Sequence, residues 1–221
     1  MIRLQNITKT YNYKKANAFE ALHGISLEIA DGELVAVIGT SGSGKSTLLH
    51  ILGCVDGFEQ GTYLMDGRDI SKCTEAQSAE IRNTKIGIVV QDFALVENYS
   101  VLENVMLPFF FDRKTSIAAA RKCAAKALRQ VGMGAFLHKP VSKLSGGQKQ
   151  RAAIARAIVK SPALLLADEP TGALDSKTSA EIMALFRALN EAGTTIVIVT
   201  HDPEIAAQAD RVIRIEDGRI V

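Results

Sequence analysis

The chain has 221 residues, 47% of them hydrophobic and 23% charged, and its formal net charge at pH 7 is +2. This is ordinary globular usage for one large domain of residues 1–221, and the balanced charge gives no indication of nucleic-acid binding. Every apolar run is shorter than the about 18 residues that a membrane helix needs, and the segment after Met1 lacks the apolar core of a signal peptide. The three cysteines are widely spaced, which excludes a zinc-binding pattern and suits a reduced, cytosolic protein.

The pattern of the N-terminal part predicts three antiparallel strands and, between the second and the third in the sequence, one buried strand. The antiparallel strands are expected over residues 3–9, 25–29 and 61–66, the last closed by an Asp-Gly turn. Residues 34–38 form a short apolar run, as expected of a strand buried on both faces. A helix over residues 46–52 follows, with its leucines on one side.

A glycine-rich loop joins the strand over 34–38 to the helix over 46–52, and it fits the phosphate-loop pattern G-x-x-x-x-G-K-[ST]. Glycines let backbone N–H groups close around phosphate oxygens, Lys45 supplies a positive charge, and the Ser46 hydroxyl can bind Mg²⁺. A chance glycine turn is the alternative, and the flanking strand and helix argue against it. The predicted phosphate-binding residues are Gly39, Thr40, Ser41, Gly42, Ser43, Gly44, Lys45, Ser46 and Thr47.

The middle of the chain, from about residue 91 to 160, is predicted to be mostly helical. An amphipathic helix is expected over residues 116–131, where apolar side chains recur at helical spacing from Ile117 onward. A second helix begins at Ser145-Gly146-Gly147, whose free backbone N–H groups form an anion site without a lysine. The chain therefore carries two phosphate-binding helix starts, and one small nucleotide cannot easily use both.

The C-terminal part alternates strands and helices, which indicates a parallel sheet. Strands are expected over residues 163–167, 195–200 and 212–215, and helices over 176–192 and 204–209. Asp168 and Glu169 stand at the C-terminal end of the first strand, where ligands gather in open α/β sheets. Asp168 is therefore placed to hold Mg²⁺ and Glu169 to polarise a water. A pair of solvated surface acids is the alternative, which the phosphate loop disfavours.

Three further residues are candidates for the same site, each with a plainer alternative. Gln91 follows the apolar strand over 86–90 and is otherwise a polar strand end. His201 follows the strand over 195–199, beside an Asp-Pro pair that predicts a helix start, and is otherwise part of that helix entry. Tyr11 offers an aromatic face for stacking and is otherwise a packing residue.

Together, these elements resemble the nucleotide-binding subunits of ABC transporters over essentially the whole chain. Lys45 and Asp168 match the Walker A and Walker B positions of that family. Leu144-Ser145-Gly146-Gly147-Gln148 matches the family signature without a departure. Gln91 and His201 match the Q-loop glutamine and the switch histidine. With Ala173-Leu174-Asp175 at the D-loop position, six elements stand in the right order, which makes a very specific resemblance.

The resemblance implies an α/β fold of the P-loop NTPase class, with a mostly parallel core sheet, an N-terminal antiparallel β subdomain and an inserted α-helical subdomain. The core and the antiparallel subdomain are expected over about 1–91 and 161–221, and the helical subdomain over about 92–160. Ala173-Leu174-Asp175 resembles the D-loop, although Gly172 stands where many members have serine.

The resemblance also implies hydrolysis of ATP with Mg²⁺, with Tyr11 stacked on adenine. The expected catalytic residues are Lys45, Glu169 and His201, and the expected metal ligands are Ser46, Gln91 and Asp168. Family members form a head-to-tail homodimer that buries two ATP molecules. A second copy of the chain is therefore an expected partner, and the residues expected to reach its ATP are Ser145, Gly146, Gly147 and Gln148.

Residues 93–111, from Phe93 to Phe111, are expected to bind an integral membrane permease, because in the family a permease helix docks beside the Q-loop. The three consecutive phenylalanines at 109–111 cannot all face one side of a helix, so some are expected to be exposed. The alternative is that this segment is a core-facing edge of the helical subdomain.

The stretches over residues 51–56, 168–177 and 200–203 resemble the bacterial macrolide-exporter and lipoprotein-release group, which includes peptide-antibiotic exporters. This implies an ATPase that drives a separate permease from the inner face of the cell membrane. A regulatory ABC ATPase that controls a membrane partner such as the cell-division machinery, without transport, is the alternative. The long coiled-coil insertion of DNA-repair members and the second cassette of translation factors are absent from the sequence, so no nucleic-acid partner is expected.

Overall fold

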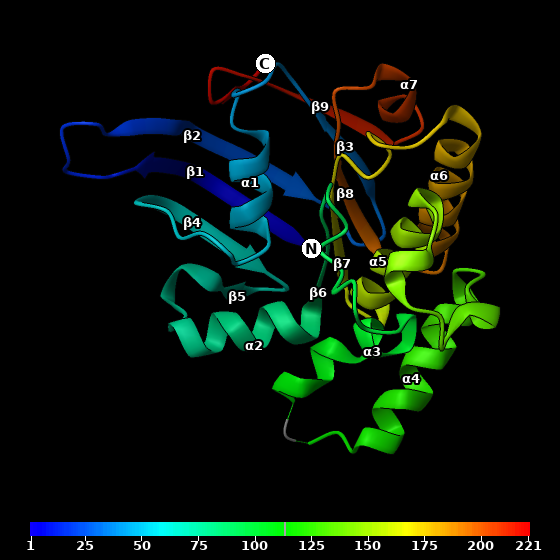
Figure 1. Ribbon diagram of the computed structural model, residues 1–221. Helices are drawn as coiled ribbons and strands as arrows, with labels where there is room; N and C mark the ends of the chain where they lie inside the picture. The colour runs from blue at the N-terminus through cyan, green and yellow to red at the C-terminus, as the bar shows by residue number, and fades with distance from the viewer. Residues whose placement is uncertain (113) are drawn as a thin grey trace.

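The computed structural model describes residues 1–112 and 114–221, and a six-stranded sheet forms its centre (Figure 1). The strand order is β10-β9-β3-β8-β7-β6, and all pairs are parallel except the antiparallel pair of β10 with β9. The strands are β3 (Leu34–Ile38), β6 (Ile86–Val89), β7 (Leu164–Asp168), β8 (Thr195–Val199), β9 (Arg211–Glu216) and β10 (Arg219–Ile220).

A second, antiparallel sheet has four strands in the order β2-β1-β4-β5. Its strands are β1 (Ile2–Tyr11), β2 (Phe19–Ile29), β4 (Gln60–Met65) and β5 (Arg68–Asp69). Asp66 and Gly67 join β4 to β5 with φ values of 51° and 78°. Both values lie in the left-handed region, which tight hairpin turns require and which aspartate and glycine tolerate.

The helices are α1 (Lys45–Leu52), α2 (Glu75–Lys85), α3 (Val101–Met106), α4 (Ile117–Gln130), α5 (Gly146–Ile158), α6 (Ser176–Glu191) and α7 (Pro203–Ala206). Short 3₁₀ segments cover Ile70–Lys72, Leu107–Phe111, Gly134–Phe136 and Val141–Lys143. Side-chain caps fix where several helices begin: Ser100 and Ser145 start α3 and α5 with complete capping boxes. Asp202 caps α7 as the sequence predicts.

The six-stranded sheet is covered on both faces, and the alternation of side chains along β7 shows how. Leu164 and Leu166 belong to a buried cluster with α1 and the antiparallel sheet. Leu165 and Ala167 belong to a second cluster with helices α3 to α6. Because successive side chains of a strand point to opposite faces, α1 and α5 lie on opposite faces of the sheet.

This architecture confirms the predicted fold class, with several local differences, among them a strand β2 that begins at Phe19 and not at residue 25. Ile117 was expected in the buried stripe of α4 and is 71% exposed, because the covered part of that helix begins one turn later at Ala120. Helix α2 was not predicted, because Ile81 is its one buried side chain and no apolar period shows in the sequence. Strand β10 was also not predicted, and α7 ends at Ala206, earlier than expected.

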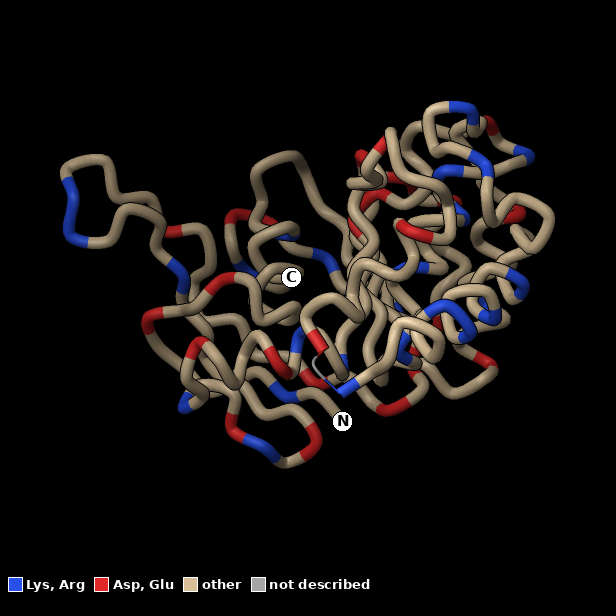
Figure 2. The backbone as a smooth tube through the Cα atoms, turned by 60° about the horizontal axis from the view of Figure 1, so that its bottom comes forward, with Lys and Arg blue, Asp and Glu red and all other residues tan. Residues whose placement is uncertain are grey.

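Basic and acidic residues are interspersed along the chain, as Figure 2 shows, which agrees with the net charge of +2. Among the described residues, no helix has the length and apolar character needed to cross a membrane.

The contact between β6 and α5 yields a test of the core packing. A Cβ atom added at Gly87 would lie 2.5 Å from the Ala157 carbonyl oxygen and 2.9 Å from Leu165 Cδ1. Because the collision is with backbone rather than with the end of a flexible side chain, Gly87→Ala should lower the free energy of unfolding by about 1–3 kcal/mol, measured by urea denaturation. The matched control is Gly57→Ala, whose added atom meets nothing within 4 Å. Equal stabilities of the two variants would contradict this packing.

Candidate functional site

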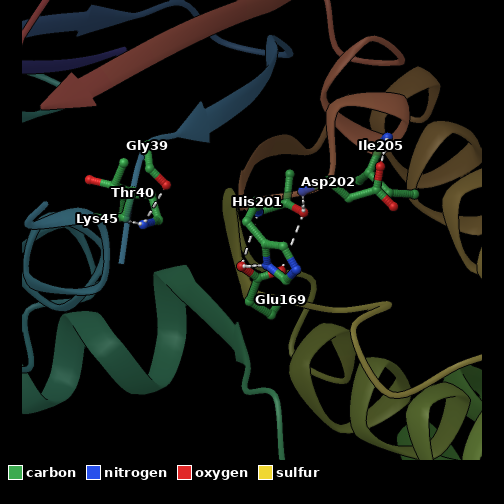
Figure 3. Close-up of polar contacts among 8 residues, drawn as sticks. Gly39, Thr40, Lys45, Glu169, His201, Asp202 and Ile205 are labelled. Carbon is green, nitrogen blue, oxygen red and sulfur yellow. Dashed lines mark hydrogen bonds and ion pairs between the residues drawn. The ribbon is translucent and has the colours of Figure 1, made fainter. Parts of the chain in front are cut away.

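The candidate site lies where three parallel strands end at the same edge of the sheet. In the register of β3, β8 and β7, Val37 lies opposite Val199, and Val199 lies opposite Asp168. The loops after these strands therefore bring the glycine-rich loop, Glu169 and His201 to one region, as Figure 3 shows. This edge is where open α/β sheets bind ligands.

Lys45 is the buried cation of the glycine-rich loop. Its residue is 9% exposed, and its Nζ donates hydrogen bonds to the carbonyl oxygens of Gly39 at 3.0 Å and Thr40 at 2.7 Å (Figure 3). The two neutral carbonyls take up two of its three N–H donors without neutralising the charge. A buried ammonium in this state favours the arrival of an anion.

Two further residues of this loop, Gly39 and Ser43, are tightly packed, and one of them offers a donor for a phosphate group. Gly39 has a φ of 156°, and a Cβ atom there would collide with the carbonyl oxygen of Ile215 and lie 2.7 Å from Ser43 Oγ. Among the described residues, Ser43 Oγ is buried and has no hydrogen-bond partner. The close approach to Ile215 explains the glycine at position 39, and the unpartnered Ser43 hydroxyl is a donor that a bound oxyanion would use.

Asp168 and Ser46 are brought together across the sheet edge. Burial and the neighbouring negative charge of Glu169 raise the pKa of Asp168, and a hydrogen bond with the Ser46 side chain opposes that rise. Among the described residues, no group of three or more His, Cys, Asp or Glu side chains is placed to hold a metal ion. A divalent cation here would therefore need hydroxyl and phosphate oxygens beside the one carboxylate, which is the oxygen-rich set that Mg²⁺ prefers.

Glu169 and His201 form the central pair of the site. Glu169 Oε1 lies 2.7 Å from His201 Nδ1 and accepts from the His201 backbone N–H at 3.0 Å (Figure 3). Glu169 has a φ of 45°, a left-handed conformation that a non-glycine residue adopts at the cost of local strain. The hydrogen bond to Glu169 and then its negative charge raise the pKa of His201.

Tyr11 lies beside the end of the glycine-rich loop. Its hydroxyl donates to Asp56 Oδ2 at 2.8 Å and lies 3.4 Å from Thr47 Oγ1. The ammonium of Lys9 is 5.2 Å from the centre of the Tyr11 ring. The hydroxyl contacts place the ring next to the start of α1.

The remaining predicted residues divide between this region and a distant one. Gln91 follows β6 and lies next to Gly172, because a Cβ atom added at Gly172 would be 3.9 Å from Gln91 Nε2. The segment Ser145 to Gln148 lies instead at the start of α5, on the opposite face of the sheet from α1. Ser145 and Gln148 exchange capping hydrogen bonds there, and the first turns of α5 are held beside α6 by the Arg151–Glu181 ion pair at 2.9 Å.

Two residues of the site were not predicted from the sequence. Thr200 is fully buried, donates to Glu169 Oε2 at 3.3 Å and accepts from the Asp202 backbone N–H at 3.0 Å. Asp56 fixes the Tyr11 hydroxyl. The position of Thr200 between a buried strand and His201 was a usable signal, whereas Asp56 is far from Tyr11 in the sequence and carries none.

Comparison with known proteins gives a family match. Residues 22–172 match the family model described as "ABC transporter". An ABC transporter ATP-binding protein of Bacillus subtilis, YknY, is 49% identical over the whole chain and 95% of its own length. The macrolide export ATP-binding/permease protein MacB of Syntrophobacter fumaroxidans is 48% identical over the whole chain, which spans 31% of that longer protein.

A solved structure supports the same conclusion. The ATP-binding cassette MJ0796, described as a dimeric post-hydrolysis state bound to ADP and Pi, has a TM-score of 0.90 and 42% sequence identity. The alignment covers 100% of this chain and 96% of that one.

The Glu169–His201 pair yields a pH prediction. Because Glu169 stabilises the protonated imidazole, the paired state is complete below the ordinary histidine pKa and is lost as the pH rises through the raised value. Glu169→Gln removes the charge, so the pKa of His201 should fall toward its ordinary value, measured by NMR titration. The other three histidines serve as internal controls. An unchanged His201 titration in this variant would contradict the contact.

Proposed function

The chain belongs to the ABC transporter ATPases, and from this membership we propose that it energises a separate membrane permease of the macrolide-exporter or lipoprotein-release type. In this proposal, two copies of the chain close on ATP at the inner face of the cell membrane. Their closure drives export or mechanical release of a drug, peptide or lipoprotein. In the same proposal, the chain is divided into a core with an antiparallel β subdomain, over about 1–91 and 161–221, and a helical subdomain over about 92–160.

The observation that carries the proposal is the position of the two glycine-marked helix starts. The start of α1 adjoins Lys45 at the sheet edge, and the start of α5 lies on the other sheet face. A nucleotide seated on Lys45 would leave the free N–H groups at the start of α5 unused. A head-to-tail second copy would supply them, and the description of MJ0796 as a dimer with ADP and Pi supports that arrangement.

We assign the site residues as follows. The glycine-rich loop and Lys45 hold the phosphates, and Tyr11 stacks on adenine. Mg²⁺, when bound, neutralises phosphate charge, and Ser46, Gln91 and Asp168 would hold it. Glu169 orients the attacking water, and His201 contacts the γ-phosphate. Most of the rate gain in this chemistry comes from positioning and electrostatic stabilisation of the phosphates.

The first prediction of this proposal concerns Glu169. Glu169→Gln should bind ATP, lower the rate of ATP hydrolysis by about 100-fold or more and accumulate an ATP-bound dimer, because the neutral amide no longer activates water. Phosphate release and sedimentation velocity with and without ATP measure the two effects. Glu191→Gln, an exposed site at the end of α6, is the control. Hydrolysis at the wild-type rate would remove Glu169 from this role.

The permease is proposed to dock at residues 93–111 and the groove beside them. Phe110 and Phe111 are 66% and 82% exposed, as the run of three phenylalanines predicts. Phe111 and Pro108 line a groove of about 860 Å³ together with Ile86, Ile88 and Arg156. The groove is also lined by charged residues, among them Arg82 and Lys160. Exposed aromatic side chains at the rim of a groove of mixed polarity are typical of a protein-binding surface.

Several side chains of this segment serve the core instead, which limits the docking surface. Val101, Leu102, Val105 and Met106 are buried in the helical layer, and Leu95 packs against it. A charged residue at Leu95 would therefore disturb the core as well as any docking. Phe111 is the better test position.

The docking proposal predicts that Phe111→Glu weakens binding of the permease and leaves basal ATP hydrolysis unchanged. Loss of a central aromatic contact of about 2 kcal/mol corresponds to a loss of binding of about 30-fold. Recovery of the permease with the tagged chain from detergent-solubilised membranes measures it. Ile117→Glu, which is 71% exposed outside this segment, is the control. Equal recovery with both variants would exclude Phe111 from the interface.

The same capture experiment separates the two functions. Recovery of a permease whose purified complex transports a substrate supports the exporter or release role. Recovery of a membrane partner without a transport path, such as a component of the cell-division machinery, supports the regulatory alternative. Recovery of soluble proteins alone would contradict both.

A further inference from the structure

The loop that directly follows Gln91 has an unusual backbone. Phe93 and Ala94 are consecutive non-glycine residues with φ values of 63° and 44°. L-residues visit the left-handed region singly and briefly, and a pair persists where surrounding contacts hold it. The contacts that hold this pair therefore set the conformation of the chain next to Gln91.

The Phe93 backbone N–H donates to the Val90 carbonyl oxygen at 3.1 Å, and the side-chain contacts come from one residue of α5. Arg156 donates from Nη2 to the Phe93 carbonyl oxygen at 2.9 Å and from Nη1 to the Ala94 carbonyl oxygen. Burial lowers the pKa of Arg156, and the negative charge of Asp92 opposes that effect. A planar guanidinium with its donors directed at two adjacent carbonyls fixes both peptide groups at once.

The same helix holds the neighbouring segments through further cations. Lys149 lies 3.6 Å from Glu97, so the stretch from Phe93 to Glu97 is attached to α5 at both ends. Lys160, just beyond the end of α5, pairs with Asp112 at 3.2 Å. These segments are thus connected to α5 by charged side chains, whereas Gln91 follows directly from the core sheet.

Helix α5 is itself a stiff connection to the signature segment at its start. Its buried side chains Ala152, Ala153, Ile154, Ala155 and Ile158 are packed in the helical layer. Arg156 lies ten residues from Gly146, a distance of about 15 Å along the helix. A displacement of the helix start would therefore reach the loop after Gln91 through Arg156.

We propose that Arg156 is a positioning residue for ATP hydrolysis, which fixes the loop after Gln91 to α5 so that Gln91 and the segment from Ser145 to Gln148 move together. This inference rests on the roles proposed above for Gln91 and that segment. It adds a residue that touches neither nucleotide nor metal. A role in stability alone is the alternative, and the kinetics separate the two.

The test is a double-mutant cycle on the basal ATPase activity of the full chain. Arg156→Met keeps the aliphatic stem and removes the donors. It should lower kcat about tenfold and leave the KM for ATP within twofold, because binding precedes the coupled movement. Arg156→Lys, with donors restored, should recover part of the loss. In a Gln91→Ala background, Arg156→Met should cost less than a further threefold, because both changes interrupt the same connection.

Arg151→Met is the matched control on the same helix. Its guanidinium donates to the Val131 carbonyl oxygen and to Glu181, away from the loop after Gln91. Its effect on kcat should therefore be the same with glutamine or alanine at position 91. A role of Arg156 in stability alone predicts the same independence, with rate losses that follow the melting temperature.

The other results of this cycle would overturn either the role of Arg156 alone or the roles of both Arg156 and Gln91. A kcat of Arg156→Met within twofold of wild type, or an undiminished effect in the Gln91→Ala background, overturns this inference alone. A wild-type rate of Gln91→Ala removes Gln91 from the proposed site and this inference with it. If Arg156→Met does not fold, the cycle with Arg156→Lys decides by the same criteria. Failure to find a permease leaves these basal rates unchanged and is therefore distinguishable.

Discussion

The parallel hydrogen bonding of β3, β8 and β7 is the constraint on which the site depends. Each strand is buried on both faces, so its register is held by side chains on two sides and by two neighbouring ladders. The strands therefore end in line, and residues more than a hundred positions apart meet at one edge. A shift of one residue in β7 would exchange the two faces and move Asp168 away from Ser46.

The charged side chains at this edge are held in place by hydrogen bonds within the chain. Lys45 is held by two carbonyl oxygens, which take up two of its three donors and leave its positive charge uncompensated. Glu169 is held by His201 and Thr200 through hydrogen bonds to both carboxylate oxygens. The cation and the carboxylate are thus held on separate loops, as the proposed binding of a phosphate between them requires. Preorganisation of this kind is the main source of rate enhancement in phosphoryl transfer.

Helix α5 connects the edge to the rest of the molecule. Its start carries the family signature, its middle fills the helical layer, and its cations hold the chain after β6. The groove beside Phe111 is lined partly by the same helix. One element is therefore shared by the proposed nucleotide side and the proposed permease side, which is a physical basis for coupling between them.

The sequence by itself determined the fold class, the family and the location of the motifs, because short local patterns carry them. The glycine-rich loop, the strand before Asp168 and the caps at Ser145 and Asp202 are each readable within about ten residues. Helix α2 was not predicted because a largely exposed helix has no apolar period. The predicted burial of Ile117 was wrong because periodicity does not show where the neighbouring element that covers a helix ends. Tertiary structure alone decided the contacts of Glu169 with Thr200, of Tyr11 with Asp56 and of Arg156 with the carbonyls after Gln91. Such contacts join segments that are far apart in the sequence, and the register of the sheet and the packing of α5 bring those segments together. A local sequence pattern carries no information about which distant segment will lie beside it.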